Sequence, residues 1–589
     1  MSEKGSPVLS FLLAGLILGI ALLAAVPPVD RDALTHHLAV PKLYLQHGGI
    51  VELPEIEFSY YPMNLDLLYL IALFLGNDIL PKYIHFAFGL LTAFLIYLHL
   101  FRRLRSRFWG LAGAVFFLSL PVVVKLSITV YVDLGLIFFS TAALLSLLQW
   151  AESGMGWRWM LVSAISCGLA LGTKYNGLIT FFLLSALVPF LAARSAKQAS
   201  PRILLRTACW TAAFIAISLT VFSPWMIRNV LWTGNPIYPL YNGVFRSWNP
   251  VGETRIEEPA IPAGEEGSSQ GMGHFVARRL VFGESALETF SIPLRIFFQG
   301  EDDNPKYFDG RLNPALFLFS LIAFWAWGRL GPRERTERIV LAGFSLFYLL
   351  YTFFTVDMRI RYVGPIVPPL VILSVYGMKE ALHLPGRLGM GRKTGRQAAI
   401  PLVLLALVFA PNGAYIARQF EIVRPLDYLT GLVSRDDYIA RHRKDYPAFR
   451  FINAALPEDA KILGLYMGNR LYYSDRLLVF GDRFFEESLS GAQSAADLAA
   501  RILEKGFSHI LLWGDLLSHL AAGTMSAKDL AVFNEFIGGY TRTLFARDGF
   551  FVLEIVTPAA DSSPYTVGVA EELGASAGCG LSRFAGKRT

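Results

Sequence analysis

The sequence predicts a polytopic α-helical membrane protein that ends in a small α/β domain. Of its 589 residues, 54% are hydrophobic and only 17% are charged, and the mean hydropathy is +0.45. A soluble protein of this length is rarely so apolar. Long apolar runs recur over residues 1–416, and from residue 417 to 556 the composition becomes that of an ordinary soluble domain.

The apolar runs are about 16 to 20 residues long, which is enough for a helix to cross a bilayer, and they predict about eleven crossings. The first could instead be a cleaved signal peptide, because Lys4 precedes it and Ala24-Ala25-Val26 ends it. The predicted crossings lie near 8–27, 82–101, 108–126, 132–150, 158–173, 176–194, 204–224, 312–328, 338–355, 361–378 and 398–416.

Basic residues gather in four short loops, at 102–107, 194–206, 329–338 and 387–396. All four fall on one side if the N-terminus is cytoplasmic, as the positive-inside rule requires. This topology makes 28–81 and 225–311 extracytoplasmic loops, and it places the C-terminal domain outside as well. Leu65 to Leu75 is too short to span and predicts a helix at the membrane interface.

Composition also excludes some classes of protein. The net charge of +7 is explained by the topology loops, so nucleic-acid binding is not predicted. The three cysteines, Cys167, Cys209 and Cys579, are scattered, which argues against a disulfide framework and against a thiolate metal site.

The C-terminal domain, 417–556, contains three short apolar runs that read as strands, 461–466, 509–513 and 550–555, with a helical pattern at 495–505 between two of them. The tail 557–589 is rich in Ala, Gly and Ser and is predicted to be unstructured. Within the loop 225–311, the Pro- and Glu-containing stretch 259–266 indicates either a lid over a site or a disordered insertion.

Polar residues that could take part in catalysis or binding collect at the outer membrane boundary of this topology, and their convergence predicts a functional site there. They are Asp30, Asp32, His36, His37, Lys42, Tyr60, Tyr61, Asp133, Lys174, Tyr175, Asn176, Arg228, Arg359 and Arg361.

Asp32 is the candidate general base, because a carboxylate at this position could take the proton of an attacking hydroxyl or amine. It could also serve only as an N-cap, since Ala-Leu-Thr-His-His-Leu follows it. Asp30 comes after Pro27-Pro28 and is given a supporting role. Asp133 is the second candidate acid, and it too could be a cap at the start of a span.

Lys174, Arg359 and Arg361 are the candidate ligands of a donor phosphate. Lys174 interrupts an apolar stretch and could instead snorkel to the interface. The two arginines depart from the positive-inside pattern, which favours an anionic lipid partner, although either could pair with Asp357.

His36-His37 resembles half of a metal site, yet no HExxH or comparable spacing accompanies it, and polar packing is the competing interpretation. No Walker-type GxxxxGK[ST] and no GxSxG elbow is present, so neither ATP-driven nor serine-hydrolase chemistry is predicted.

Several short motifs resemble a known superfamily. Asp30 to Leu38, followed by Pro41-Lys42-Leu43-Tyr44-Leu45 and Tyr60-Tyr61-Pro62, is similar to the first extracytoplasmic loop of the GT-C glycosyltransferases. Bacterial dolichyl-phosphate-mannose-protein mannosyltransferase-like proteins and lipid A aminoarabinose transferases are the nearest groups. Later matching segments, within a resemblance over roughly residues 8 to 420, are 131–134, 173–177, 234–239 and 361–369.

The resemblance implies a GT-C fold and an inverting transfer of a sugar from a polyprenyl-phosphate donor to a periplasmic acceptor, at the inner membrane of a bacterium. Asp32 matches the position of the catalytic aspartate, Asp133 a second acidic position, and Lys174 and Arg361 the basic positions near the lipid phosphate. The Asp-Glu pair frequent in the family is Asp32-Ala33 here, and Tyr61 stands where a basic residue is common.

No cofactor is required by this reaction, and a divalent cation between Asp32 and the donor phosphate is left open. Two other functions remain as alternatives. A transporter or flippase of a lipid-linked sugar would need the same phosphate ligands, but its site is expected at the bilayer midplane. A noncatalytic membrane scaffold would act through its C-terminal domain alone.

Overall fold

The structure is a computed structural model that describes residues 5–195, 201–246, 273–387, 395–514, 516–517 and 525–556. It divides into two compact units. Unit 1 comprises Met1–Pro28, Tyr60–Asn242 and Gly271–Leu432, and unit 2 comprises Val29–Ser59, Gly243–Gln270 and Val433–Thr589. The predicted tail 557–589 and the stretch 259–266 lie outside the described residues.

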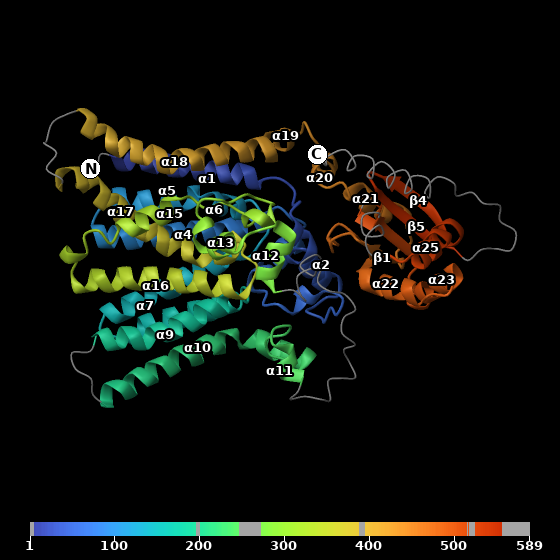
Figure 1. Cartoon of the computed structure of the whole chain (residues 1–589), viewed down its shortest axis with the longest axis horizontal. Helices are drawn as coiled ribbons and strands as arrows, with labels where there is room; N and C mark the ends of the chain where they lie inside the picture. Colours follow the sequence, from blue (N-terminus) through green and yellow to red (C-terminus); the bar gives the residue numbers. More distant parts are fainter. Residues whose placement is uncertain are drawn as a thin grey trace. The chain divides into compact units, whose positions relative to one another are not determined.

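Unit 1 is helical, and α7, α9, α10 and α16 run alongside one another in it (Figure 1). Its helices are α1 (Ser6–Ala24), α3 (Asn64–Phe74), α4 (Leu80–Leu104), α5 (Arg107–Ser119), α6 (Pro121–Ser127), α7 (Asp133–Glu152), α8 (Trp157–Leu171), α9 (Gly177–Ser195), α10 (Pro201–Thr233), α12 (His274–Phe282), α13 (Ala286–Phe290), α14 (Ile292–Arg295), α15 (Ala315–Ile322), α16 (Pro332–Thr355), α17 (Val367–Arg387), α18 (Gly395–Val423) and α19 (Pro425–Leu429), with the 3₁₀ segments η5 (Pro305–Tyr307), η6 (Trp327–Arg329) and η7 (Ile360–Ile366).

Seven helices among the described residues are long and apolar enough to cross a membrane, or eight if the bent pair α5 and α6 counts as one span. The protein is therefore a multi-pass membrane protein, but a number of eleven crossings is not confirmed. The stretches 158–173 and 312–328 contain α8 and α15, which have 15 and 8 residues. The stretch 398–416 falls within α18, and the side chains of 398–407 lie outside the described residues. α3 has 11 residues, which agrees with its interpretation as a non-spanning helix.

Two breaks in the helices precede Asp133. Pro121 at the start of α6 ends α5, because a proline cannot continue the hydrogen bonding of a helix, and the two helices meet at 66°. The chain then passes through irregular residues 128–132 and enters α7 at Asp133. A carboxylate thus stands at the first residue of a membrane-length helix, where the amide groups of the first turn favour negative charge.

Unit 2 joins the segment after the first span to the C-terminal domain. Its helices are η2, a π-helical turn (Ala33–His37), α2 (Ala39–Gln46), α20 (Arg435–His442), α21 (Tyr446–Ala455), α22 (Asp482–Gly491), α23 (Ala495–Glu504) and α25 (Ala527–Tyr540), and its strands are β1 (Lys461–Leu465), β2 (Leu477–Phe480), β3 (His509–Trp513), β4 (Thr541–Arg547) and β5 (Phe550–Ile555). Two short elements, η3 (Glu57–Tyr60) and α11 (Asn242–Arg246), fall where segments of the two units meet in the chain.

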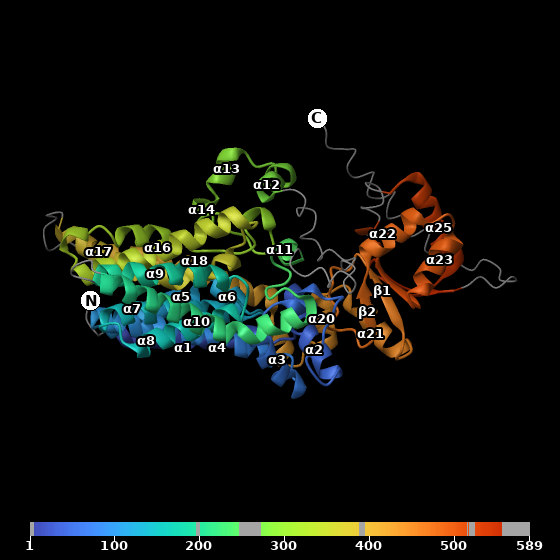
Figure 2. The same cartoon turned by 90° about the horizontal axis from the view of Figure 1, so that it is seen from below.

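The five strands form one sheet in the order β2-β1-β3-β5-β4. β1 pairs in parallel with β2 and β3, whereas β5 runs antiparallel to its two neighbours. α22, α23 and α25 cover one face, and α21 covers the other (Figure 2). The predicted small sheet is confirmed, and the three strands expected from sequence are β1, β3 and β5. β2 and β4 were not predicted: β2 has only four residues, and β4 carries polar residues at both ends.

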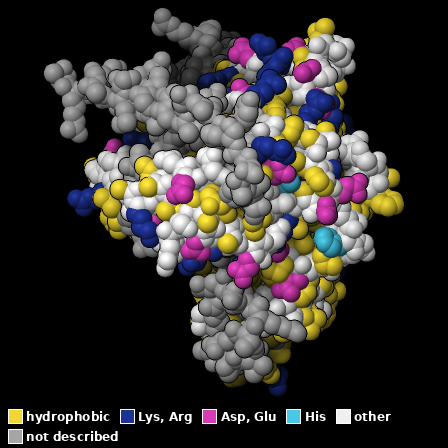
Figure 3. Space-filling view, turned by 90° about the vertical axis from the view of Figure 1, so that its right-hand side faces the viewer, with side chains coloured by type: hydrophobic (Ala, Val, Ile, Leu, Met, Phe, Trp, Pro, Cys, Tyr) yellow, Lys and Arg dark blue, Asp and Glu magenta, His cyan; other side chains and the backbone are white. Residues whose placement is uncertain are grey.

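The predicted first loop packs against the C-terminal domain within unit 2. The N–H groups of Leu471 and Tyr472 both donate to the carbonyl oxygen of Leu34, each at 3.1 Å. On the face of the molecule drawn in Figure 3, acidic and basic side chains are interspersed with hydrophobic ones, as on a water-exposed surface.

Candidate functional site

The sequence-predicted residues fall into two clusters, one in each unit. In unit 1, Lys174 Nζ donates a hydrogen bond to Asp133 Oδ1 at 2.8 Å. The Asp133 side chain is 2% exposed and that of Lys174 is 19% exposed. The N-cap residue of α7 is Val132, and the Asp133 carboxylate is bonded to Lys174 and not to the helix backbone, so the capping alternative for Asp133 is not supported. Lys174 pairs with a buried carboxylate, so it does more than snorkel.

Both partners of this pair keep hydrogen-bonding capacity. Asp133 Oδ2 is buried and has no hydrogen-bond partner among the described residues. Among the described residues, Lys174 Nζ makes one hydrogen bond, the one to Asp133. An ammonium has three N–H donors, so two of them remain for a ligand.

His85 fixes the backbone that presents Asp133. Its Nε2 accepts from the N–H of Leu134 at 2.9 Å, and its Nδ1 lies 2.9 Å from the carbonyl oxygen of Leu126. A histidine that accepts at Nε2 and donates at Nδ1 is neutral. His85 was not predicted from the sequence, although it is one of two histidines, with His99, inside the apolar run at 82–101.

Arg361 and Arg359 lie beside aromatic rings near the pair. The Arg361 guanidinium lies 5.1 Å from the ring centroid of Tyr131 and 5.3 Å from that of Tyr362. It is also close enough to Asp133 for the two opposite charges to attract each other. Lys174 Nζ also lies 5.3 Å from the Tyr362 ring, and Arg359 lies 5.8 Å from it. Tyr362 therefore orders three cations, a role that its sequence position alone did not reveal.

Asp357, the alternative partner of the two arginines, binds in another cluster. Arg278 Nη1 donates to its Oδ1 at 3.1 Å, and the same guanidinium holds Glu284 through two hydrogen bonds of 2.9 and 3.0 Å. Arg295 adds further bonds to Glu284 at 3.2 Å. Burial would raise the pKa of Glu284, but the two guanidinium groups outweigh it and hold that pKa below its ordinary value.

Tyr60 and Tyr61 are held through their main chain. Arg228 Nη2 donates to the carbonyl oxygens of Tyr60 and Tyr61 at 2.5 and 3.0 Å, and Asn229 Nδ2 donates to that of Tyr60 at 2.9 Å. The Arg228 guanidinium itself lies 4.6 Å from the ring of Trp225 and 4.9 Å from that of Trp232. These contacts anchor the two tyrosines at the start of the second segment of unit 1.

In unit 2, Asp32, His36 and His37 form the second cluster. One ligand atom of each lies within 4.8 Å of the others, an arrangement that could hold a metal ion. Asp32 stands at the N-cap position of η2, yet its side chain makes no cap hydrogen bond, so the cap-only interpretation is not supported. The carboxylate is half-buried, as a general base that meets an incoming substrate should be.

Asp30 and Lys42, two other predicted residues of this segment, contact the C-terminal domain. Burial raises the pKa of Tyr438, and the nearby carboxylate of Asp30 raises it further, so Asp30 lies against α20. Lys42 Nζ donates to the carbonyl oxygens of Tyr472 and Ser474, at 2.9 and 2.7 Å, and to Asp475 Oδ1 at 2.8 Å. All three donors of Lys42 are occupied, which marks it as an anchor of the loop on the domain.

The structure thus brings together Asp133, Lys174 and Arg361 in unit 1, and Asp32, His36 and His37 in unit 2. The first cluster combines a buried carboxylate with cations, which suits the binding of a phosphate in a site of low dielectric. The second combines a carboxylate with imidazoles, which suits proton transfer or the binding of a cation.

The chain is similar to known membrane proteins. A family model described as dolichyl-phosphate-mannose-protein mannosyltransferase matches residues 56–232. No curated protein matches the chain by sequence. Among solved structures, ArnT from Cupriavidus metallidurans in the apo state has a TM-score of 0.55 at 13% identity, covering 95% of this chain and 100% of that chain.

Two further structures share the fold. ArnT from Cupriavidus metallidurans bound to undecaprenyl phosphate has a TM-score of 0.53 at 14% identity, covering 95% of this chain and 100% of that one. An oligosaccharyltransferase from Archaeoglobus fulgidus, tethered with an acceptor peptide, has a TM-score of 0.54 at 14% identity, covering 94% of this chain and 75% of that one. The chain is therefore similar to the mannosyltransferase family over residues 56–232, and it shares the fold of the ArnT and oligosaccharyltransferase structures along nearly its whole length.

Proposed function

We propose that this protein is an inverting glycosyltransferase that moves a sugar from a polyprenyl-phosphate donor to an acceptor outside the cytoplasm. The observation that carries the proposal is Lys174, an ammonium fixed 2.8 Å from the buried Asp133 with two N–H donors uncommitted. The family match supports transfer from a lipid-linked donor, and one solved structure that shares the fold holds undecaprenyl phosphate.

In the proposed reaction, Asp32 accepts the proton of the acceptor hydroxyl or amine as that group attacks the anomeric carbon of the sugar. The bond from this carbon to the phosphate oxygen breaks on the opposite face, so the configuration inverts. Lys174 and Arg361 then stabilise the negative charge that develops on the leaving polyprenyl phosphate. Asp133 positions Lys174 and does not itself react.

No cofactor enters this reaction, because the charge of the leaving group is met by Lys174 and Arg361. A divalent cation at Asp32, His36 and His37 would compete with the general-base role, since a carboxylate that binds a metal is a weaker base. Transfer that persists in excess chelator supports Asp32 as a metal-free base, and loss of transfer that Mn²⁺ or Mg²⁺ restores assigns the cluster to a cation.

The proposed location is the inner membrane of a bacterium, with the N-terminus in the cytoplasm and unit 2 in the periplasm. The clustering of Arg and Lys in loops 102–107, 194–206, 329–338 and 387–396 supports this orientation. A reporter that is active only outside the cytoplasm, fused after residue 556, tests it.

The Asp32→Asn variant tests the function. Loss of the general base should lower sugar transfer by about 10²- to 10⁴-fold, measured by mass spectrometry of envelope glycans and lipids from a deletion strain that carries the variant. Binding of undecaprenyl phosphate to the purified protein should be unchanged. Asp459→Asn, an exposed carboxylate of the same unit, is the matched control and should leave both readouts unaltered.

The alternatives give other results. A noncatalytic scaffold would show no sugar-dependent product before or after the change. A transporter would move a lipid-linked sugar with either residue at position 32, and the acceptor would stay unmodified by the purified protein. Either result would exclude the proposed transferase.

A further inference from the structure

The segment from α12 to α14 carries large apolar side chains that are exposed. Leu287 on α13 is 81% exposed, and Leu280 on α12 and Phe290 on α13 are each 66% exposed. The other members of this set, called here the α12–α14 apolar surface, are Val276, Val281, Leu294 and Phe298. Figure 2 shows α12 and α13 to one side of the long helices of unit 1. An apolar surface of this kind on a folded protein marks a contact with a partner or with a membrane.

From residue 286 to 298, apolar, buried and polar side chains occupy separate faces of one helical path. Backbone hydrogen bonds from residue i to i−4 continue through Ser291 and Arg295, so α13 and α14 keep the helical order. The exposed apolar face holds Leu287, Phe290, Leu294 and Phe298, the opposite face holds the buried Thr289, Ile292 and Ile296, and a side between them holds Glu288, Ser291 and Arg295. A helix with these three faces fits three surroundings, namely the protein, water and an apolar medium.

The inner side of the segment is fixed to unit 1 by the ion cluster around Arg278. In addition to its carboxylate partners, this buried guanidinium donates to the carbonyl oxygen of Lys306 at 2.6 Å. The ring of Phe308 lies 5.1 Å from the Arg278 guanidinium and 5.5 Å from that of Arg295. The segment therefore cannot turn its apolar surface inward without breaking a buried and hydrogen-bonded charge cluster.

The surface is continuous with the exposed side of a membrane-length helix. The ring of Phe275 on α12 lies 5.2 Å from that of Phe353 and 6.3 Å from that of Phe354, both in the last turn of α16. α16 is long and apolar enough to cross a membrane. Its own exposed apolar side chains include Leu346, Phe347 and Phe354. Because acyl chains surround the exposed side of a spanning helix, the adjoining α12–α14 apolar surface faces the same medium.

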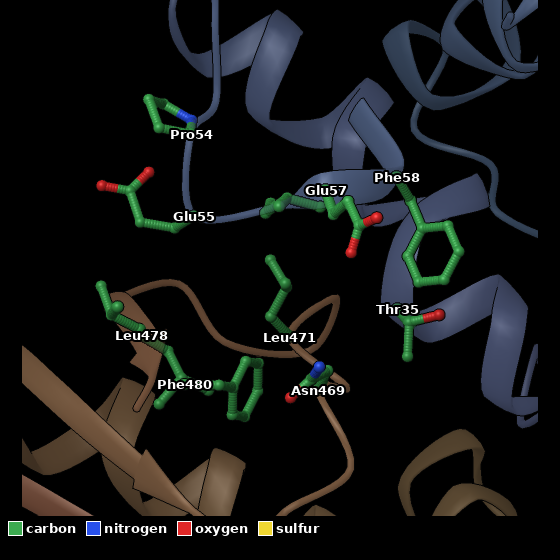
Figure 4. A pocket seen from close by; sticks show the side chains of 11 residues that line it. Thr35, Pro54, Glu55, Glu57, Phe58, Asn469, Leu471, Leu478 and Phe480 are labelled. Atoms are coloured by element: carbon green, nitrogen blue, oxygen red, sulfur yellow. The ribbon is translucent and has the colours of Figure 1, made fainter. Parts of the chain in front are cut away.

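Apolar side chains of unit 2 have a different environment. Leu471, Leu478 and Phe480 line a pocket whose other side is the segment 54–58 of the same unit (Figure 4). A part of the protein itself thus faces these side chains. No described residue covers the α12–α14 apolar surface in this way, as the exposed fractions of Leu287 and Phe290 show.

We propose that the α12–α14 apolar surface inserts into the bilayer leaflet beside the C-terminal end of α16, which is the outer leaflet in the proposed orientation. Its leucine and phenylalanine side chains lie among the upper parts of the acyl chains, and the exposed Arg279 lies among the lipid phosphates. The occupant is lipid because the surface continues the side of α16 that meets the acyl chains. The loop predicted over 225–311 then returns to the membrane at residues 274–298, whichever reaction the protein catalyses.

Quenching by lipids with brominated acyl chains tests this proposal on the full-length protein in nanodiscs. Cys209→Ala with Cys579→Ser leaves the buried Cys167 as the one native cysteine. A bimane fluorophore is then attached to Leu287→Cys. We expect brominated lipid to quench this label about as strongly as a label at Phe347→Cys on α16, and iodide in the water to quench it several-fold less than a label in water.

Leu530→Cys, which replaces an exposed leucine on α25, is the matched control and should give the reverse pattern, with strong quenching by iodide and weak quenching by brominated lipid. Both replaced leucines are exposed, so an unchanged unfolding midpoint is expected for each variant. Equal iodide quenching at positions 287 and 530 would overturn the proposal, because the surface would then lie in water. A label at 287 that is protected from both quenchers would also overturn it, and disulfide cross-linking between copies would then identify a second copy of the chain as the partner.

Discussion

Lys42 and Lys174 are both lysines predicted for the same site, but their surroundings differ. Lys42 Nζ donates three hydrogen bonds, to two carbonyl oxygens and to the carboxylate of Asp475, all within residues 472–475. Lys174 Nζ makes one hydrogen bond among the described residues, to Asp133. The number of occupied donors separates an anchoring lysine from one that can still bind a ligand.

The partners of the two lysines differ in the same sense. Asp475 is 55% exposed, so its attraction for Lys42 is screened by water and is worth little by itself. Asp133 is 2% exposed, so its charge depends on Lys174 and on the nearby Arg361. Position along the chain did not distinguish the two cases. Burial and donor count do.

The largest expected effect comes from Lys174→Met. Removing the ammonium leaves the buried carboxylate of Asp133 without its hydrogen-bond partner, and breaking a buried pair costs about 3–5 kcal/mol. We expect a lower thermal unfolding midpoint in detergent and loss of undecaprenyl phosphate binding. An unchanged affinity for undecaprenyl phosphate would remove Lys174 from the donor site.

The double variant Asp133→Leu with Lys174→Met separates stability from ligand binding. Replacing both members of a buried pair by apolar residues is often neutral for folding, so the unfolding midpoint should recover most of what Lys174→Met lost. Binding of undecaprenyl phosphate should stay lost. Recovery of both would show that the pair is only structural.

Lys42→Met should have a smaller effect, confined to unit 2. It removes three hydrogen bonds from a charged donor, for which about 1.5–3 kcal/mol is expected. The readout is faster amide hydrogen exchange in the segments around residues 34 and 472, with undecaprenyl phosphate binding unchanged. Asp475→Asn is the control and should cost at most about 1 kcal/mol, since that carboxylate is exposed. Loss of lipid binding in Lys42→Met would contradict its assignment as an anchor.

The smallest expected effect concerns pH. The pKa of Glu284 is below its ordinary value of 4.5, because Arg278 and Arg295 outweigh the effect of burial. A carboxyl group whose folded pKa is lowered stabilises the fold above its unfolded pKa, and this contribution disappears as the pH falls through the folded value. The thermal unfolding temperature should therefore fall as the pH is lowered below about 4.5, and this fall should be smaller in Glu284→Gln. An identical acid profile in both proteins would refute this contribution.

Composition and periodicity were enough for the class of fold. The apolar runs that predict spans are helices such as α4, α7 and α16, and the runs at 509–513 and 550–555 are β3 and β5. Counting spans was less successful, because α15 stops after eight residues and α8 has 15, and apolar composition does not report where a helix ends. β2 went unnoticed since four residues are too few to show a period.

The candidate site shows the same division. The sequence alone was enough to select the candidate residues Asp32, Asp133, Lys174 and Arg361. Charged residues beside or within apolar runs are costly to desolvate and therefore indicate function. Which of them pair does not follow, because Asp133 and Lys174 are 41 residues apart and meet only through the packing of helices. His85 and Tyr362 were missed for that reason: each acts through a neighbour that is remote in sequence or through a ring face.

The sequence by itself determined that this chain crosses a membrane several times, carries a small α/β domain and resembles the GT-C glycosyltransferases, because hydropathy, charge bias and short motifs are local properties. Tertiary structure alone decided that Lys42 is an anchor whereas Lys174 keeps donors for a ligand, and that the exposed apolar residues of α12–α14 adjoin those of α16. The physical reason is that hydrogen-bond saturation and burial depend on which distant segments pack together, and no local pattern encodes that.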